Sequence, residues 1–231
     1  MKTRAGQEAA RIASRPMHAA RRGDHRSDLG SYRVTSTMPD TETLLRELNH
    51  RVKNNFQIIV SLMNLQKRML PAERREDIRF VEEHVQSMSV AYRLVYDTGS
   101  IVDVPLPELI TEVLSGLRQI AGLNDDQILV EIPAIPASLS LDRGIALALY
   151  LAVLMPPYLD EVMATMGIVT VTVGIAAKLV TLTARVNCKE PFAFDVLRSR
   201  LMQAYAAQLG VETPRETRHG EQQIRFPLEP P

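Results

Sequence analysis

Apolar side chains recur every three or four residues along two stretches after residue 39, a spacing typical of amphipathic helices. With Leu45 at position a of a heptad, the first seam includes two polar members: Leu45, Leu48, Val52, Asn55, Ile59, Leu62, Gln66 and Met69. The second seam has no polar member: Ile78, Val81, Val85, Met88, Tyr92 and Val95. We predict a first helix, capped by Asp40 or Thr41, that runs to about Leu70, and a second over 72–96. Because Pro71 leaves only a short connection, the two helices should be antiparallel neighbours.

After residue 100 the pattern changes to short strands that alternate with helices. We predict strands over 102–104, 128–132, 168–176, 179–186 and 222–226, and helices over 107–121, 141–154 and 194–209. The Val- and Thr-rich strands on either side of residues 177 and 178 should form a hairpin. Pro156-Pro157 should end the long apolar helix, and Gly210 the last one. This order predicts an α/β sandwich, in which helices cover one sheet.

The predicted fold class is therefore α+β, with a helical hairpin over 40–98 and a sandwich domain over 101–231. Two helices with one apolar seam do not form a sufficient core alone. They can bury the seam against the following domain or against a second copy, and we favour a homodimer with a four-helix bundle. Residues 1–39 hold eight Lys or Arg against three acidic residues and show no periodicity. This composition predicts a disordered basic tail.

Composition narrows the class of protein further. The chain has 231 residues, 45% of them hydrophobic, and a formal net charge of zero, so the whole molecule has no bias toward nucleic acid or membrane. The longest apolar stretch, residues 144–158, is too short for a membrane span and suits a buried helix. No secretory signal is evident. The single cysteine, Cys188, excludes an intramolecular disulfide, fits a packing role and favours a cytoplasmic location.

His50 is the main candidate for chemistry. It falls at heptad position f, opposite the seam, so the imidazole should face solvent or a partner. A neutral imidazole is a good nucleophile near physiological pH. The flanking Arg51 and Lys53 can bind the oxygens of a phosphoryl group, while Asn54 or Glu47 can hold the other ring nitrogen in one tautomer. The other histidines have no metal-ligand spacing with a third ligand, and no metal site is expected.

The sequence around this histidine resembles a known family. Leu-Arg-Glu-Leu-Asn-His-Arg-Val-Lys-Asn-Asn at 45–55, continued by Phe-Gln-Ile-Ile at 56–59, is similar to the phosphoacceptor box of bacterial sensor histidine kinases. The H-R-x-K-N core is most similar to the subgroup related to the HWE kinases. The resemblance covers about residues 41–98. It implies a dimerisation and phosphotransfer hairpin in which His50 is phosphorylated.

The following domain departs from the family at its nucleotide motifs. Residues 140–147 resemble the start of the helix that bears the ATP-binding asparagines, yet the aligned positions are Ala152, Val153 and Pro157, and neither Ala nor Val can ligand Mg²⁺. The Asp-Gly-x-Gly motif is replaced by Asn-Cys-Lys-Glu-Pro at 187–191. The glycine-rich phosphate loop is replaced by Phe-Ala-Phe-Asp at 192–195, which lacks the glycines that allow a close backbone approach. We therefore expect a degenerate domain without bound ATP.

The leading hypothesis is a histidine phosphotransferase that exchanges phosphoryl groups between His50 and receiver-domain aspartates of response regulators. The receiver would supply Mg²⁺, so no cofactor is expected on this chain. Docking should use the first helix near His50 and an exposed face of the second that includes Arg79, Glu83 and Gln86. The alternatives are an ATP-dependent histidine kinase with a divergent site, a non-catalytic scaffold of a kinase or receiver, and nucleic-acid binding through the basic tail.

Overall fold

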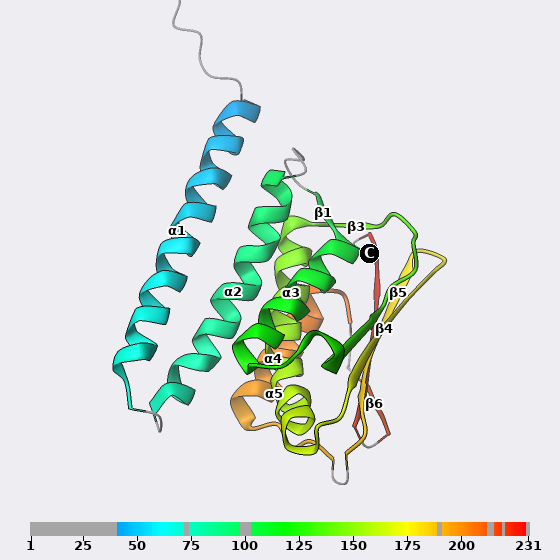
Figure 1. Cartoon of the computed structure of the whole chain (residues 1–231). Coiled ribbons are helices and arrows are strands. Elements are labelled where there is room, and N and C mark those ends of the chain that lie inside the picture. Colours follow the sequence, from blue (N-terminus) through cyan, green and yellow to red (C-terminus); the bar gives the residue numbers. More distant parts are fainter. Residues whose placement is uncertain are drawn as a thin grey trace, which may run out of the picture. The chain divides into compact units, whose positions relative to one another are not determined.

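The computed structural model describes residues 41–71, 74–97, 103–188, 191–211, 215–218 and 220–229. The predicted tail over 1–39 lies outside these residues. The chain begins with two long helices, α1 (Thr41–Met69) and α2 (Arg75–Asp97), which pack side by side (Figure 1). Both predicted helices are confirmed, and α2 begins three residues later than expected.

A mixed five-stranded sheet forms one layer of the rest. It contains β2 (Ile128–Glu131), β4 (Val169–Ala176), β5 (Leu179–Val186), β7 (Glu221–Pro227) and β6 (Arg215–Arg218), in that spatial order. The β2–β4 pair is parallel and the others are antiparallel. Two short strands, β1 (Asp103–Pro105) and β3 (Ser138–Ser140), pair separately. We did not predict β3 or β6, because their sequences, Ser-Leu-Ser and Arg-Glu-Thr-Arg, contain a single apolar residue between them and so lack the apolar pattern of a strand.

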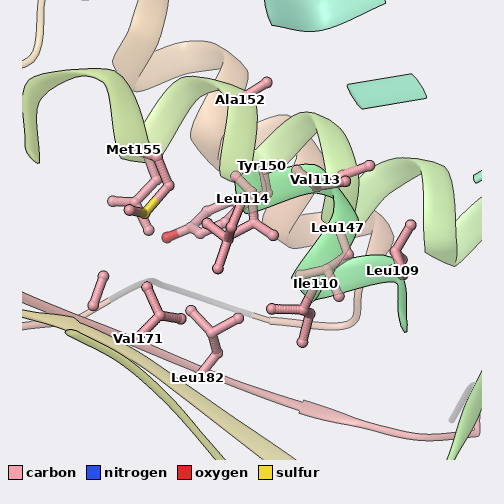
Figure 2. Packing of buried hydrophobic residues seen from close by; sticks show 14 of the residues in the cluster. Leu109, Ile110, Val113, Leu114, Leu147, Tyr150, Ala152, Met155, Val171 and Leu182 are labelled. Atoms are coloured by element: carbon pink, nitrogen blue, oxygen red, sulfur yellow. The ribbon is translucent and has the colours of Figure 1, made fainter. Parts of the chain in front are cut away.

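Three helices and one short turn complete the sandwich: α3 (Leu106–Ala121), η2 (Asp125–Gln127), α4 (Leu141–Thr165) and α5 (Val196–Gln208). Figure 2 shows side chains of α3 and α4 meeting Val171 and Leu182 of the sheet. Residues at every second position of β4 and β5 are buried, and the Thr residues between them face outward. The predicted sandwich, with helices on one side of a sheet, is confirmed.

The long helix α4 differs from the prediction. It continues through Pro156 and Pro157 to Thr165, whereas we expected the prolines to end it. The prolines remove two hydrogen bonds to preceding carbonyls, but the amides beyond them can still continue the helix. Tyr158, Leu159 and Val162 are buried in the core, and this burial favours helix over a chain end at the prolines.

Helix α2 belongs to the same core as the sandwich. Val90, Ala91, Leu94 and Val95 are buried in one apolar cluster with side chains of α3 and α4. α2 therefore packs against α1 on one side and against α3 and α4 on the other. The boundary that we placed between residues 98 and 101 stays a prediction.

Helix α4 is the one helix in the described part of the chain that is long and apolar enough to cross a membrane. However, 72% of its most apolar window is buried inside the protein. This burial is what the core helix of a globular domain shows, as the sequence predicted. The cytoplasmic location stays a prediction.

Candidate functional site

His50 lies in the third turn of α1, and its side chain is exposed. One stripe of partly buried side chains on α1 faces α2: Val52, Phe56, Val60, Met63 and Lys67. The Phe56 and Tyr92 rings are 5.3 Å apart, and Lys67 Nζ lies 2.7 Å from Glu82 Oε2 on α2. His50 is about a third of a turn away from this stripe. The imidazole is therefore accessible, as the heptad position predicted.

A second apolar stripe of α1 faces away from α2. Its members are 42–79% exposed: Leu44, Leu48, Ile58, Ile59, Leu62, Leu65 and Met69. The seam that we predicted as one surface therefore divides, since Val52 faces α2 while Leu48, Ile59 and Leu62 face outward. His50 is about a third of a turn from the outward stripe as well. The imidazole thus occupies a third, polar face of the helix.

The structure brings His50 and Asn54 together. Asn54 Nδ2 lies 3.3 Å from His50 Nδ1, as expected for residues one helical turn apart. Glu47 instead pairs with Arg51, whose Nη2 lies 2.5 Å from Glu47 Oε1. Arg51 is exposed, whereas Lys53 is half-buried. Of these two residues, Asn54 is therefore the one whose contact with the imidazole the structure shows.

The predicted docking face of α2 is wrong. Glu83 is only 1% exposed, and Arg79 contacts Asp160 on α4, with Nη2 and Oδ1 2.9 Å apart. Gln86 packs beside Gly116 on α3. All three side chains lie on the side of α2 that meets the sandwich. The spacing of apolar residues along the sequence did not distinguish this side from the side that faces solvent.

The positions aligned with the family's nucleotide ligands lie in tight packing. Ala152 and Val153 are fully buried, and Figure 2 shows Ala152 on the side of α4 away from the sheet. Because α2 packs against α4, this part of the helix is covered. Pro157 lies within the helix and is partly buried.

The end of β5 opens onto a hollow of about 680 Å³ between α4 and the segment before α5. Its described lining is mostly apolar and includes Ile168, Cys188 and Phe192; it has one carboxylate, Glu161, and no Lys or Arg. Phe192 packs on Tyr158, with ring centroids 4.5 Å apart.

The N-terminus of α5 is occupied by the chain's own carboxylate. Asp195 Oδ1 accepts a hydrogen bond of 2.7 Å from the Arg198 amide. A helix N-terminus binds phosphate through such amides, so the cap takes one donor that an anion would need.

Comparison with known proteins agrees with this geometry. Residues 47–121, from the second turn of α1 to the end of α3, match the HisKA_2 family model, described as histidine kinase. The histidine kinase domain of the Erythrobacter litoralis EL346 blue-light activated histidine kinase has a similar fold: TM-score 0.51, 20% identity, covering 81% of this chain and 94% of that chain.

A second structure, titled Erythrobacter litoralis EL346 blue-light activated histidine kinase, gives a TM-score of 0.50 at 20% identity and covers 83% of this chain. The alignment covers 64% of that chain, slightly less than two thirds of its length. No curated protein matches the sequence. The chain thus contains a histidine kinase-like domain, which implies two-component signalling. The relation to the HWE subgroup stays a prediction.

Proposed function

We propose that this protein is a histidine phosphotransferase of a two-component phosphorelay, in which His50 exchanges a phosphoryl group with receiver aspartates. The observation that carries the proposal is the position of His50 on a polar face of α1, away from both apolar stripes. A receiver can approach this face even when the outward stripe is covered. Gln57, Ser61 and Asn64 continue the same face along the helix.

The chemistry needs a nucleophilic ring nitrogen. Nε2 attacks phosphorus of the receiver's aspartyl phosphate, an N–P bond forms, the P–O bond to aspartate breaks, and the carboxylate leaves with its electron pair. Nε2 is nucleophilic only when the ring proton sits on Nδ1. A half turn of the Asn54 amide places Oδ1 against Nδ1, where it accepts that proton's hydrogen bond and holds this tautomer.

Arg51, the next residue along the chain, is an exposed cation that can assist the transfer. Its guanidinium is exposed, and its salt bridge with Glu47 is of the exposed i, i+4 kind that is worth less than about 1 kcal/mol. It can therefore leave Glu47 and bind a phosphoryl oxygen. Mg²⁺ is supplied by the acidic pocket of the receiver, as expected from the resemblance, so the chain needs no metal of its own.

The direct test is incubation with a receiver phosphorylated at its aspartate, followed by detection of label on this protein. We expect a label that is labile in acid and stable in base, at a rate set by receiver concentration. Absence of label with several phosphorylated receivers, each shown to donate to another histidine phosphotransferase, would falsify the proposal.

We predict that Mg-ATP neither labels nor stabilises the protein. Ala152 and Val153 are fully buried, the described lining of the hollow beside β5 has no cation, and Asp195 caps α5. The melting temperature with millimolar Mg-ATP should therefore shift by less than about 1 °C, since a nucleotide that does not bind adds no stability. The measurement is a thermal scan, with an active histidine kinase as positive control. A saturable shift with label on His50 would instead identify an ATP-dependent kinase.

We also propose a homodimer built on the outward stripe of α1. Seven large apolar side chains in one row form an exposed patch of the kind that marks an interface. A second copy, related by a two-fold axis, would bury the row in a four-helix bundle with α2. His50 would remain outside the bundle.

The Leu62→Glu variant tests this interface. The new charge would be buried twice in a symmetric dimer, so we expect the dissociation constant to rise by about 100-fold or more. Sedimentation equilibrium measures it. Asn64→Glu is the matched control: Asn64 is exposed on the His50 face of the same helix, and its variant should remain a dimer. A wild-type protein that is monomeric at all concentrations would contradict the interface.

A further inference from the structure

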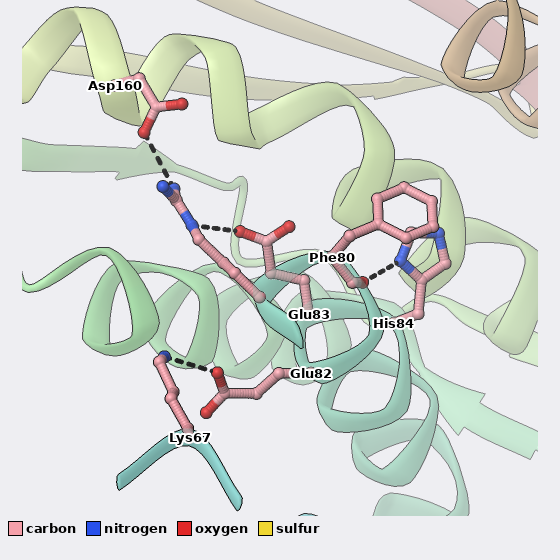
Figure 3. Close-up of polar contacts among 7 residues, drawn as sticks. Lys67, Phe80, Glu82, Glu83, His84 and Asp160 are labelled. Atoms are coloured by element: carbon pink, nitrogen blue, oxygen red, sulfur yellow. Dashed lines mark hydrogen bonds and ion pairs between the residues drawn. The ribbon is translucent and has the colours of Figure 1, made fainter. Parts of the chain in front are cut away.

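Ionisable side chains gather where α2 meets α4 and α5. α2 contributes Arg79, Glu83 and His84, α4 contributes Asp160, and α5 contributes Arg198. Arg79 Nε donates to Glu83 Oε1 and Arg79 Nη2 to Asp160 Oδ1, both at 2.9 Å (Figure 3). Arg79 therefore joins α2 to α4. The Arg198 guanidinium lies over the Phe80 ring of α2, 5.6 Å from its centroid, and joins α5 to the same cluster.

This junction leaves several buried polar atoms unsatisfied. In the described residues, five buried side-chain atoms lack a hydrogen-bond partner, and four of them belong to this part of α2 and to α5: Glu83 Oε2, His84 Nε2, Ser87 Oγ and Arg198 Nη1. Such atoms oppose burial, because they lose their hydrogen bonds to water without gaining a partner in the protein. Toward its C-terminus α2 instead buries Val90, Ala91 and Leu94. The end of α2 near the hairpin turn is therefore the weakly held end.

The charges at the junction do not balance when Glu83 is ionised. Arg79 and Arg198 then face the carboxylates of Glu83, Asp160 and Asp195, the last lying 3.6 Å from Arg198. His84 adds no charge while neutral: its Nδ1 donates to the Phe80 carbonyl at 2.7 Å, and burial lowers its pKa. A proton on Glu83 makes the cluster neutral.

We propose that this junction is a proton-controlled latch between the hairpin that carries His50 and the sandwich. The latch is closed when Glu83 is protonated and loosened when Glu83 is ionised. Because the main contact of α1 is with α2, opening the latch moves both helices relative to α4 and α5. The proposal concerns the packing of α2 and is independent of the chemistry at His50.

The direction of the pH effect follows from Glu83. Burial raises its pKa from 4.5 to about 7, against the opposing attraction of Arg79. An acid whose pKa is higher in the closed state than in the open state favours closure at low pH. The favourable contribution is complete below pH 4.5, declines as the pH rises toward 7, and is absent above it. The latch therefore titrates close to neutral pH.

Hydrogen exchange of the full chain tests the latch. We expect the protection factors of amides in the first half of α2 to fall between pH 5 and pH 8 in the wild type, relative to Glu83→Gln, by roughly 50-fold. The glutamine variant cannot ionise and should stay closed at pH 8. Titration of His84 has the opposite effect on closure, because burial lowers its pKa. This effect is present in both proteins, so it cancels when their protection factors are compared. Identical pH profiles in the two proteins would overturn the latch.

Two further variants keep the test decisive. Asp160→Asn removes one carboxylate that repels Glu83, so the wild-type decline in protection should move to lower pH; an unmoved profile also overturns the proposal. Glu82→Gln is the matched control, because Glu82 is the neighbouring buried carboxylate but pairs with Lys67 on α1. This variant should increase hydrogen exchange in α1. The pH dependence of the protection factors in the first half of α2 should stay as in the wild type.

Discussion

A His50→Gln variant is expected to accept no phosphoryl label from a receiver. Glutamine keeps the polarity and nearly the size of the side chain, but it has no nucleophilic nitrogen, so the transfer rate should fall by at least about 1000-fold. Because His50 is exposed on the face of α1 away from the packing stripe, the fold should not change. The measurement is receiver-dependent labelling, with circular dichroism to confirm the helices.

Two variants separate the chemistry from packing. His84→Gln replaces the other histidine of the described helices, whose Nε2 is buried, and should leave labelling intact. Asn54→Ala removes the amide beside Nδ1 of His50 and should slow transfer by about tenfold, the value of one hydrogen bond. Labelled His50→Gln would place the phosphoryl group elsewhere. A His50→Gln variant that keeps full signalling in cells would favour a scaffold over a phosphotransferase.

The hairpin and the exposed histidine were predictable because their signals are local. Helical spacing needs only a window of a few turns, and position f of the heptad already directed His50 away from Val52. The division of the seam was not predictable in this way. Leu48 and Val52 are one turn apart, and only the position of α2 decides that the valine is covered while the leucine is exposed.

The wrong predictions from the sequence concern residues at which distant parts of the chain meet. Pro156 and Pro157 are strong local signals for the end of a helix, but burial of Tyr158 and Leu159 overrides them. Glu83 has a side chain that usually lies in solvent, and its burial depends on Arg79, which pairs with Glu83 and also contacts Asp160 of α4. No window of sequence near Glu83 contains Asp160. Contacts across some eighty residues therefore produced the feature on which the latch depends.

The packing at the positions aligned with the family's nucleotide motifs is consistent with the predicted degenerate domain. Where the family resemblance leads one to expect polar ligands, α4 presents Ala152 and Val153 to packing, and Phe192 fills space beside Tyr158. Apolar contacts of this kind would stabilise the domain without the contribution of a bound ligand. We infer that the sandwich holds α2 in place and so supports the helix that displays His50.

Replacing Arg143 is expected to destabilise the sandwich more than any surface change. This nearly buried guanidinium, at the start of α4, donates to the carbonyls of Leu209, Pro227 and Leu228. It thereby ties α4 to the end of α5 and the end of β7. Arg143→Met keeps the apolar length but removes the charged donor from three carbonyls, so we expect a loss of about 3–5 kcal/mol in the free energy of unfolding. Urea denaturation measures this loss.

Arg185→Met is the control: Arg185 pairs with Glu221 at an exposed site, and its loss should cost less than about 1 kcal/mol. Equal losses in the two variants would show that Arg143 does not hold these elements together.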